Sequence, residues 1–360
     1  MAQNLTAAES VSLLFEQDIT PVIGASGRTV RFLNRAARQL FGDVTPGTAL
    51  RKLLPEHVAL HQSKAFFATA RINGRPFTVT LSSMPGLRLF RLEPVCTDVR
   101  FASVIAPSEL FSMELGLSSN YFSVYASEHA DPALRHYAAR LERTSEQLRR
   151  WVSNVRLLRE LRNSVPPCAK QAIDCAAMLP AMLELLEPML SRHGLRIETE
   201  LPASPCPVRI LPEQFEALVL NLVSNAAGSC NAGGVIRARL ARGVHTASLT
   251  LHDTGTGFAE GILPELFRAY RDADLPHGTS DSSGYGLPVC FAVADAMKGS
   301  VLIESARGRG ATVSVILPLC TTGKAALRAP SVQDLLQSGE HYRVGISDAL
   351  TDEDYLPDNR

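Results

Sequence analysis

Short stretches of alternating apolar and polar residues near the N-terminus predict a small sheet. Residues 21–24 and 29–33 read as two strands around a tight turn. Asn34 stands at the N-cap position of a following helix, which Gly42 ends. Three further alternating runs predict antiparallel strands at residues 65–72, 76–82 and 87–92. We therefore expect a small α/β unit over residues 8–100.

The pattern turns helical over residues 105–165. Asp131 and Pro132 supply a cap and a first-turn proline, so one helix ends near His129 and a second begins. The first helix has apolar residues on two faces, which predicts that the hairpin pairs with a second copy as a four-helix bundle in a homodimer. The second carries a coiled-coil seam at Tyr137, Leu141, Thr144, Leu148, Trp151, Val155 and Leu158.

Helices and strands are mixed over residues 170–320, and we expect a helical layer on a mixed sheet there. Helices are predicted at residues 173–192, 211–227 and 287–297, and strands at residues 195–201, 235–240, 248–252, 300–305 and 312–317. The tail, residues 321–360, contains proline, serine and an acidic stretch. We expect it to be largely disordered and flexible, or a short partner-binding segment.

Composition narrows the functional classes. The 360 residues carry 36 basic and 36 acidic side chains, so bulk charge favours neither a nucleic-acid binder nor a membrane-surface protein. No apolar run approaches the roughly 20 residues that span a bilayer. The seven cysteines show no metal-ligand spacing and are expected to be free thiols, which suits a reducing cytosol and a cytoplasmic protein.

Candidate chemistry gathers between residues 221 and 286. Asn221 and Asn225 lie four apart on one face of an apolar helix, where buried amides need partners such as magnesium and phosphate oxygens. The alternative is a pair of helix-surface asparagines. Asp253 ends an apolar strand and is followed by Gly255 and Gly257, so its carboxylate points into the cavity that the turn encloses. A glycine-rich helix start follows, where backbone N–H groups can face phosphates.

Two resemblances follow from these residues. The strand-turn-strand of the N-terminal unit, with Asn34-Arg35-Ala36-Ala37 and Leu40-Phe41-Gly42, resembles a PAS sensor domain. Such a domain is a ligand-sensing or dimerising module, or a spacer with a filled core. Over residues 173–319 the chain resembles sensor histidine kinases through four boxes: Asn221-Leu222-Val223-Ser224-Asn225-Ala226, Asp253-Thr254-Gly255-Thr256-Gly257, Phe267-Arg268-Ala269-Tyr270-Arg271 and Gly284-Tyr285-Gly286-Leu287.

The second resemblance implies an α+β multidomain protein: a PAS-like sensor, an antiparallel helical hairpin and an α/β-sandwich domain that binds ATP with Mg²⁺. By this resemblance Asn225 holds the Mg²⁺ ion and Asn221 lies alongside. Asp253 reads the adenine amine, and Gly255 and Gly257 shape the adenine pocket.

The remaining family positions lie in and after residues 258–283, which are expected to form a lid over the nucleotide. Phe267 and Leu287 occupy family positions in the third and fourth boxes, and Arg271 is placed to touch phosphate. Gly284 and Gly286 let the lid close by the same resemblance.

The chain also departs from the family. Gly228 stands where a phosphate-contacting lysine is common, and Ser282 where a further glycine is common. In the hairpin, Met113 occupies the position of the phosphoacceptor histidine, while Glu114 keeps the acid that follows it. A thioether cannot accept a phosphoryl group.

The hairpin's own histidines are His129 and His136, which both lie beside its turn. His129 is a candidate for a displaced acceptor, and the alternative is that both are solvated turn residues.

These observations predict an ATP-binding signalling protein of the histidine kinase family, acting in a two-component-type pathway. The alternative from another class is a catalytically inactive scaffold, in which ATP sets the conformation and a response regulator or partner kinase reads the surface. A kinase acting on a separate protein is a third option.

Overall fold

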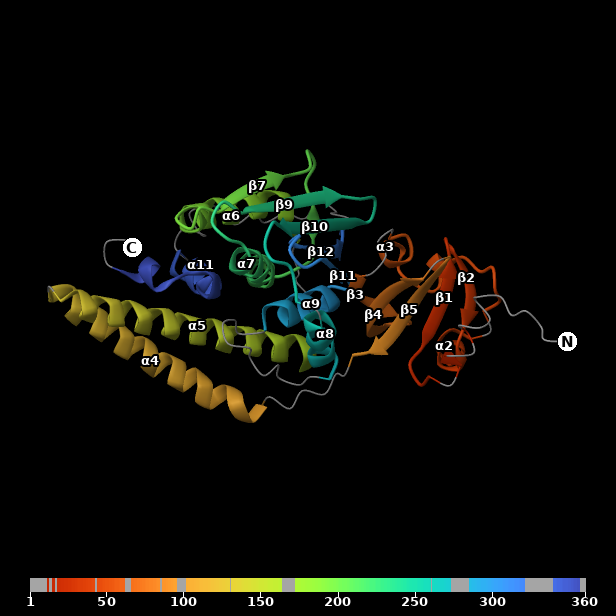
Figure 1. Ribbon diagram of the computed structural model, residues 1–360, viewed down its shortest axis with the longest axis horizontal. Coiled ribbons are helices and arrows are strands. Elements are labelled where there is room, and N and C mark those ends of the chain that lie inside the picture. Colours follow the sequence, from red (N-terminus) through yellow and green to blue (C-terminus); the bar gives the residue numbers. More distant parts are fainter. Residues whose placement is uncertain are drawn as a thin grey trace.

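Two strand-rich units and a long helical hairpin make up this chain, so the fold is a mixture of α and β as predicted (Figure 1). The computed structural model describes residues 12, 15–16, 18–42, 44–61, 66–84, 86–95, 102–129, 131–163, 172–259, 261–272, 285–320 and 339–356. No helix within these ranges is long and apolar enough to cross a membrane.

The N-terminal unit is an antiparallel sheet with short helices beside it. Its elements are β1 (Val22–Ser26), β2 (Thr29–Leu33), α2 (Arg35–Phe41), η1 (Leu50–Lys52), α3 (Glu56–Ala59), β3 (Phe66–Ile72), β4 (Arg75–Met84) and β5 (Leu87–Pro94). The predicted cap is confirmed, because the buried Asn34 side chain accepts hydrogen bonds from the backbone N–H groups of Ala37 and Val22, each at 2.9 Å. Gly42 ends α2 with a φ of 75°.

The central unit, residues 173–320, places helices on a second sheet. Its elements are β6 (Ile173–Asp174), α6 (Cys175–Ser191), β7 (Arg196–Glu200), β8 (Pro207–Val208), α7 (Pro212–Ser229), β9 (Val235–Arg242), β10 (Thr246–Asp253), α8 (Ile262–Asp272), α9 (Gly286–Ala296), β11 (Ser300–Ser305) and β12 (Ala311–Pro318). Because β7 pairs parallel with β9 while β9, β10, β11 and β12 pair antiparallel, the predicted mixed sheet is confirmed.

The two sheets are continuous, which the sequence does not predict. Strand β3 pairs antiparallel with β11, placing Ala68 opposite Leu302 and Phe67 opposite Ile303. The strand order is β2-β1-β5-β4-β3-β11-β12-β10-β9-β7. At the junction the backbone N–H of Val301 also donates to the Thr69 hydroxyl at 2.9 Å.

The hairpin consists of α4 (Ala102–Glu128) and α5 (Pro132–Asn163), and Asp131 caps α5 as predicted. Helix α5 runs between α4 and the central unit (Figure 1). Along the predicted seam, Val155 and Leu158 are buried within the single chain, whereas Tyr137 and Thr144 are exposed. Polar side chains are also buried in the hairpin: Ser112, Ser119, Ser123, Glu142, Ser145 and Glu146.

The expectation of a flexible tail is wrong for residues 339–356, which we call the terminal segment. They form α11 (Gly339–Gly345), η2 (Ser347–Ala349) and η3 (Asp352–Tyr355) and pack on α5, α6 and α7. The reason is hydrophobic burial: Tyr342, Ile346, Leu350 and Tyr355 join the core of the central unit.

Candidate functional site

Helix α7 presents its two amides to the start of α9. A Cβ atom placed on Gly286 would lie 3.1 Å from Oδ1 of Asn221 and 3.2 Å from Oδ1 of Asn225. The absence of a side chain on Gly286 therefore lets α9 approach both amides closely. The structure thus brings together three residues that the sequence singled out, and Leu287 is buried in the next position.

Asp253 ends β10 and is buried, as its place after an apolar strand predicts. Its Oδ1 atom accepts hydrogen bonds from the N–H of Gly255 at 2.9 Å, the hydroxyl of Ser229 at 3.1 Å and the N–H of Ala311 at 3.2 Å. These bonds fix the carboxylate, and no hydrogen bond from the described residues reaches its Oδ2 atom, which is left for another donor.

Glycines allow the backbone to fold closely around this carboxylate. A Cβ atom on Gly255 would lie 2.5 Å from the carbonyl oxygen of Ser229, and one on Gly257, where φ is 67°, would lie 2.5 Å from that of Ala306. Gly310 was missed: its φ is 77°, and a Cβ atom there would lie 1.9 Å from the carbonyl oxygen of Asp253. The Gly308-Arg309-Gly310 turn between two predicted strands was the available signal.

The predicted lid residues fall partly outside the described residues. Gly284 is outside them, and so is the side chain of Arg271, whose backbone lies in α8. Phe267 is a buried packing residue, stacked on Phe291 with ring centroids 4.7 Å apart and on Phe67 of β3 at 5.4 Å.

Helix α5 covers the Asn221 side of α7, which no sequence motif indicated. Arg150 is buried and donates to Oδ1 of Asn221 at 3.0 Å and to the Ser224 hydroxyl at 2.7 Å. Burial lowers the pKa of Arg150, while the carboxylate of Asp348 raises it. Asn154 exchanges two hydrogen bonds with Asn221, at 3.0 and 3.1 Å.

The two amides consequently differ. Asn221 has partners for its oxygen and its nitrogen from the protein itself, the last being the carbonyl oxygen of Ala217 at 2.8 Å. The buried Nδ2 atom of Asn225 has no partner within the described part of the chain. Asn225 is therefore the amide whose donor is left for a ligand.

Two aromatic contacts join α5 to Tyr285 and to α8. Trp151 of α5 lies edge-on to Tyr285, with ring centroids 6.0 Å apart. The guanidinium of Arg162, near the end of α5, lies over the Tyr270 ring of α8 at 4.4 Å.

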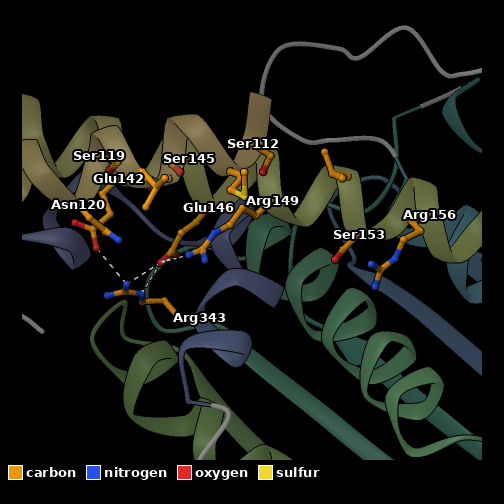
Figure 2. A pocket seen from close by; sticks show the side chains of 14 residues that line it. Ser112, Ser119, Asn120, Glu142, Ser145, Glu146, Arg149, Ser153, Arg156 and Arg343 are labelled. Atoms are coloured by element: carbon orange, nitrogen blue, oxygen red, sulfur yellow. Dashed lines mark hydrogen bonds and ion pairs between the residues drawn. The ribbon is translucent and has the colours of Figure 1, made fainter. Parts of the chain in front are cut away.

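The expected acceptor level of the hairpin lies on α4, away from the central unit. Met113 and Glu114 are exposed, and Met113 lines a cavity of about 500 Å³ between α4, α5 and Arg343 (Figure 2). Serine, glutamate and arginine side chains dominate its walls, and Arg343 bridges Glu142 and Glu146 there. Burial raises the pKa of Glu146, which the Arg343 cation opposes.

Both hairpin histidines are exposed: His129 lies at the turn, and His136 lies near the start of α5. The Nδ1 atom of His129 lies 2.7 Å from the carbonyl oxygen of Tyr125, and Nε2 of His136 lies 4.0 Å from a carboxylate oxygen of Asp352.

Comparison with known proteins identifies the central unit. Residues 211–321 match the family described as histidine kinase-, DNA gyrase B-, and HSP90-like ATPase. Adaptive-response sensory kinase SasA of Synechococcus sp. (strain JA-3-3Ab) is 27% identical over 49% of this chain and 48% of its own length. Histidine protein kinase DivJ of Caulobacter vibrioides is 30% identical over 41% of this chain and 24% of its own length. The chain thus spans half or less of these relatives.

Among solved structures, full-length ShkA in complex with AMPPNP is 19% identical over 68% of this chain and 54% of that chain, with a TM-score of 0.47. The family match covers both the Asn221–Asn225 helix and the Asp253 turn, and the matched relatives are sensory and histidine kinases. Residues 211–321 of this chain are therefore a histidine kinase-type ATPase domain, and the chain is related to sensor histidine kinases.

Proposed function

We propose that this protein binds ATP with Mg²⁺ in the central unit and uses the nucleotide in two-component-type signal transduction in the cytoplasm. The observation that carries this proposal is the Asp253 carboxylate, which is buried and held through one oxygen by three donors. Its other oxygen suits an adenine amine, and the close-packed Gly255 and Gly257 backbone shapes the pocket around it.

Asn225 is the proposed Mg²⁺ residue. Its amide supplies one hard oxygen ligand, and its unpartnered Nδ2 atom suits a phosphate oxygen. Mg²⁺ is held in nucleotide sites by few protein atoms, because phosphate oxygens and waters supply the others. The donor set therefore fits the ion, which neutralises phosphate charge when it is bound.

The other family positions join this proposal by resemblance. Asn221 lies beside Asn225, Gly286 gives α9 its close approach, and Arg271 and Gly284 are proposed to contact phosphate and to let the lid close.

Self-phosphorylation is in doubt because Met113 stands at the acceptor position, although Glu114 is retained. The second candidate is accordingly a catalytically inactive scaffold that binds ATP and regulates a response regulator or a partner kinase. His129, exposed at the hairpin turn, remains a candidate for a displaced acceptor.

The hairpin is proposed to form a homodimer through a four-helix bundle. Support comes from large apolar side chains that recur along α4 at helical spacing and are exposed in one copy. They are Phe111, Met113, Leu117, Tyr121, Val124 and Tyr125. The N-terminal unit is proposed to be a PAS-like module, whose core is lined with buried apolar side chains.

One experiment tests nucleotide binding and phosphoryl transfer together. Purified protein is titrated with a fluorescent ATP analogue and Mg²⁺, and is then incubated with γ-labelled ATP so that any label can be mapped. In Asn225→Ala we expect binding weakened by about ten- to a hundredfold, because a bond to a charged group is worth roughly 1.5–3 kcal/mol. The same change at the exposed Asn120 of α4 is the matched control and should leave affinity unchanged.

The mapped label separates the two candidates. Acid-labile label on a histidine, lost in Asn225→Ala, overturns the scaffold. Nucleotide binding without label contradicts self-phosphorylation. Failure of the wild-type protein to bind ATP with Mg²⁺ removes the basis of both.

A further inference from the structure

The terminal segment makes two kinds of contact with the rest of the chain. Its apolar side chains enter the core, and the backbone of Gly345 passes so close to α7 that a Cβ atom there would lie 2.6 Å from a methyl carbon of Leu220. The charged side chains of Arg343, Asp348 and Asp352 instead reach α5. The segment therefore touches α7 and α5 at once.

The contacts with α5 follow one stripe of that helix. They are Arg343 with Glu142 and Glu146 at 3.2 and 2.7 Å, Asp352 with Arg143 at 3.2 Å, the Tyr355 hydroxyl with Glu146 at 2.8 Å, and Asp348 with Arg150 at 2.6 Å. Positions 142, 146 and 150 are four apart, so they lie on one face of the helix. Figure 2 shows the Arg343 end of this stripe. The segment thus binds α5 along two turns through charges.

Arg150 links the stripe to the candidate site. The same guanidinium that pairs with Asp348 also donates to Asn221 and Ser224. With Asn154 adding two more bonds, the Asn221 amide uses both of its donors and both acceptor positions within the protein. In this arrangement Asn221 has no hydrogen-bonding capacity left for a ligand. The guanidinium cation of Arg150 also lies in contact with its amide oxygen.

We propose that the terminal segment is an autoinhibitory clamp: by holding Arg150 through Asp348, it keeps α5 on α7 and Asn221 occupied until the clamp opens. This inference rests on the proposed nucleotide site. Nucleotide with Mg²⁺ can contact Asn221 only after Arg150 and Asn154 have moved away from it. Nucleotide binding therefore disfavours the closed clamp, and the closed clamp weakens nucleotide binding. Whatever frees the segment from α5 raises nucleotide affinity.

The test uses the full chain and the variant Asp348→Asn, which removes the charge and keeps the shape. Asp352→Asn is the matched control, because Asp352 lies on the same segment but pairs with Arg143, which does not touch Asn221. Asp348→Glu keeps the charge, so most of the protein should stay in the closed state in this variant. Affinity for a fluorescent ATP analogue with Mg²⁺ should rise about tenfold in Asp348→Asn and less than twofold in Asp352→Asn.

A second readout does not depend on nucleotide. Trp151 is the single tryptophan, it follows Arg150, and it lies against Tyr285. If the clamp opens, acrylamide should quench Trp151 emission more strongly in Asp348→Asn than in the wild type or Asp352→Asn. Far-UV circular dichroism of each variant verifies that the helices are intact.

The two readouts separate the possible failures. Unchanged quenching and unchanged affinity in Asp348→Asn overturn the clamp. More exposed Trp151 with unchanged affinity overturns its inhibitory role. If Trp151 becomes exposed in Asp348→Asn but neither the wild type nor this variant binds nucleotide, the proposed function is wrong. The inhibition of nucleotide binding is then wrong as well, whereas the role of Asp348 in holding α5 is supported.

Discussion

The central unit is joined to the rest of the chain on two sides, and the two junctions use different chemistry. On one side β3 extends the sheet through β11, so backbone pairing and the Phe67–Phe267 stack hold the N-terminal unit. On the other side α5 is held by buried charged and amide side chains around Arg150. Backbone pairing tolerates most side chains, whereas a buried ion pair fails when one partner is lost. The sheet junction is therefore the robust one, and the α5 junction can be changed by single residues.

The largest difference should appear when one arginine is removed at each junction. Arg150→Met leaves Asp348 without its buried cation, and we expect the free energy of unfolding to fall by about 3–5 kcal/mol. Arg71→Met breaks the Arg71–Asp295 pair of the sheet junction, where the arginine side chain is 32% exposed, and should cost about 1 kcal/mol or less. Urea denaturation of both variants measures the difference, and equal losses would contradict the comparison.

The pH dependence of stability should differ in sign between the contact of α7 with the terminal segment and the sheet junction. Burial, with repulsion from Glu213, raises the pKa of Glu216 on α7 to about 7. Its neighbour His341, 3.8 Å away, does not offset this, because burial lowers the pKa of that imidazole and leaves it uncharged near neutrality. The folded state binds more protons at Glu216 than the unfolded state, so stability is lost as pH rises from about 4.5 to 7.

Glu216→Gln removes this penalty. We expect it to raise the free energy of unfolding at pH 8 by about 1–3 kcal/mol and to have little effect at pH 4.5. Denaturant unfolding at the two pH values measures this, and an equal gain at both would show that charge is not the cause.

His57 gives the opposite dependence at the sheet junction, where its Nε2 atom contacts the Ser300 hydroxyl. Burial, with a smaller contribution from His61, lowers the pKa of His57 to about 4. The unfolded state binds the proton more tightly, so stability is present above about pH 6.5 and is lost as pH falls toward 4.

His57→Gln keeps a polar side chain and removes the titration. We expect the acid-induced loss of stability between pH 6.5 and 4 to shrink by roughly 1–2 kcal/mol in this variant. Denaturant titrations of the variant and the wild type at pH 7 and 4.5 measure this change. If the free energy of unfolding falls equally in both proteins, another group causes the acid sensitivity.

The sequence predicts what depends on local pattern. The Asn34 cap, the hairpin break at Asp131 and the mixed sheet follow from spacing and capping chemistry and are confirmed. The proximity of Asn221, Asn225 and Gly286 was accessible through the resemblance of their boxes to sensor histidine kinases, and the structure shows that Gly286 opens α9 against the two amides of α7. The two capping signals lie at the ends of single elements.

Contacts between distant elements were not predictable in the same way. Nothing in β3 or β11 specifies the other as a partner, because strand pairing uses backbone atoms. Arg150 and Asn154 look like surface positions until α7 is placed against them. The terminal segment was misjudged from its composition, although Tyr342, Ile346 and Leu350 recur at four-residue steps, which is a helical apolar stripe.

The continuous sheet also bears on solubility. A strand at the edge of a sheet presents unpaired N–H and C=O groups that can pair with another molecule. Because β3 and β11 cover each other, the outermost strands of the sheet are β2 and β7. A fragment cut to the central unit alone would uncover the β11 edge, with its apolar Val301, Leu302 and Ile303, and would be prone to aggregate through it.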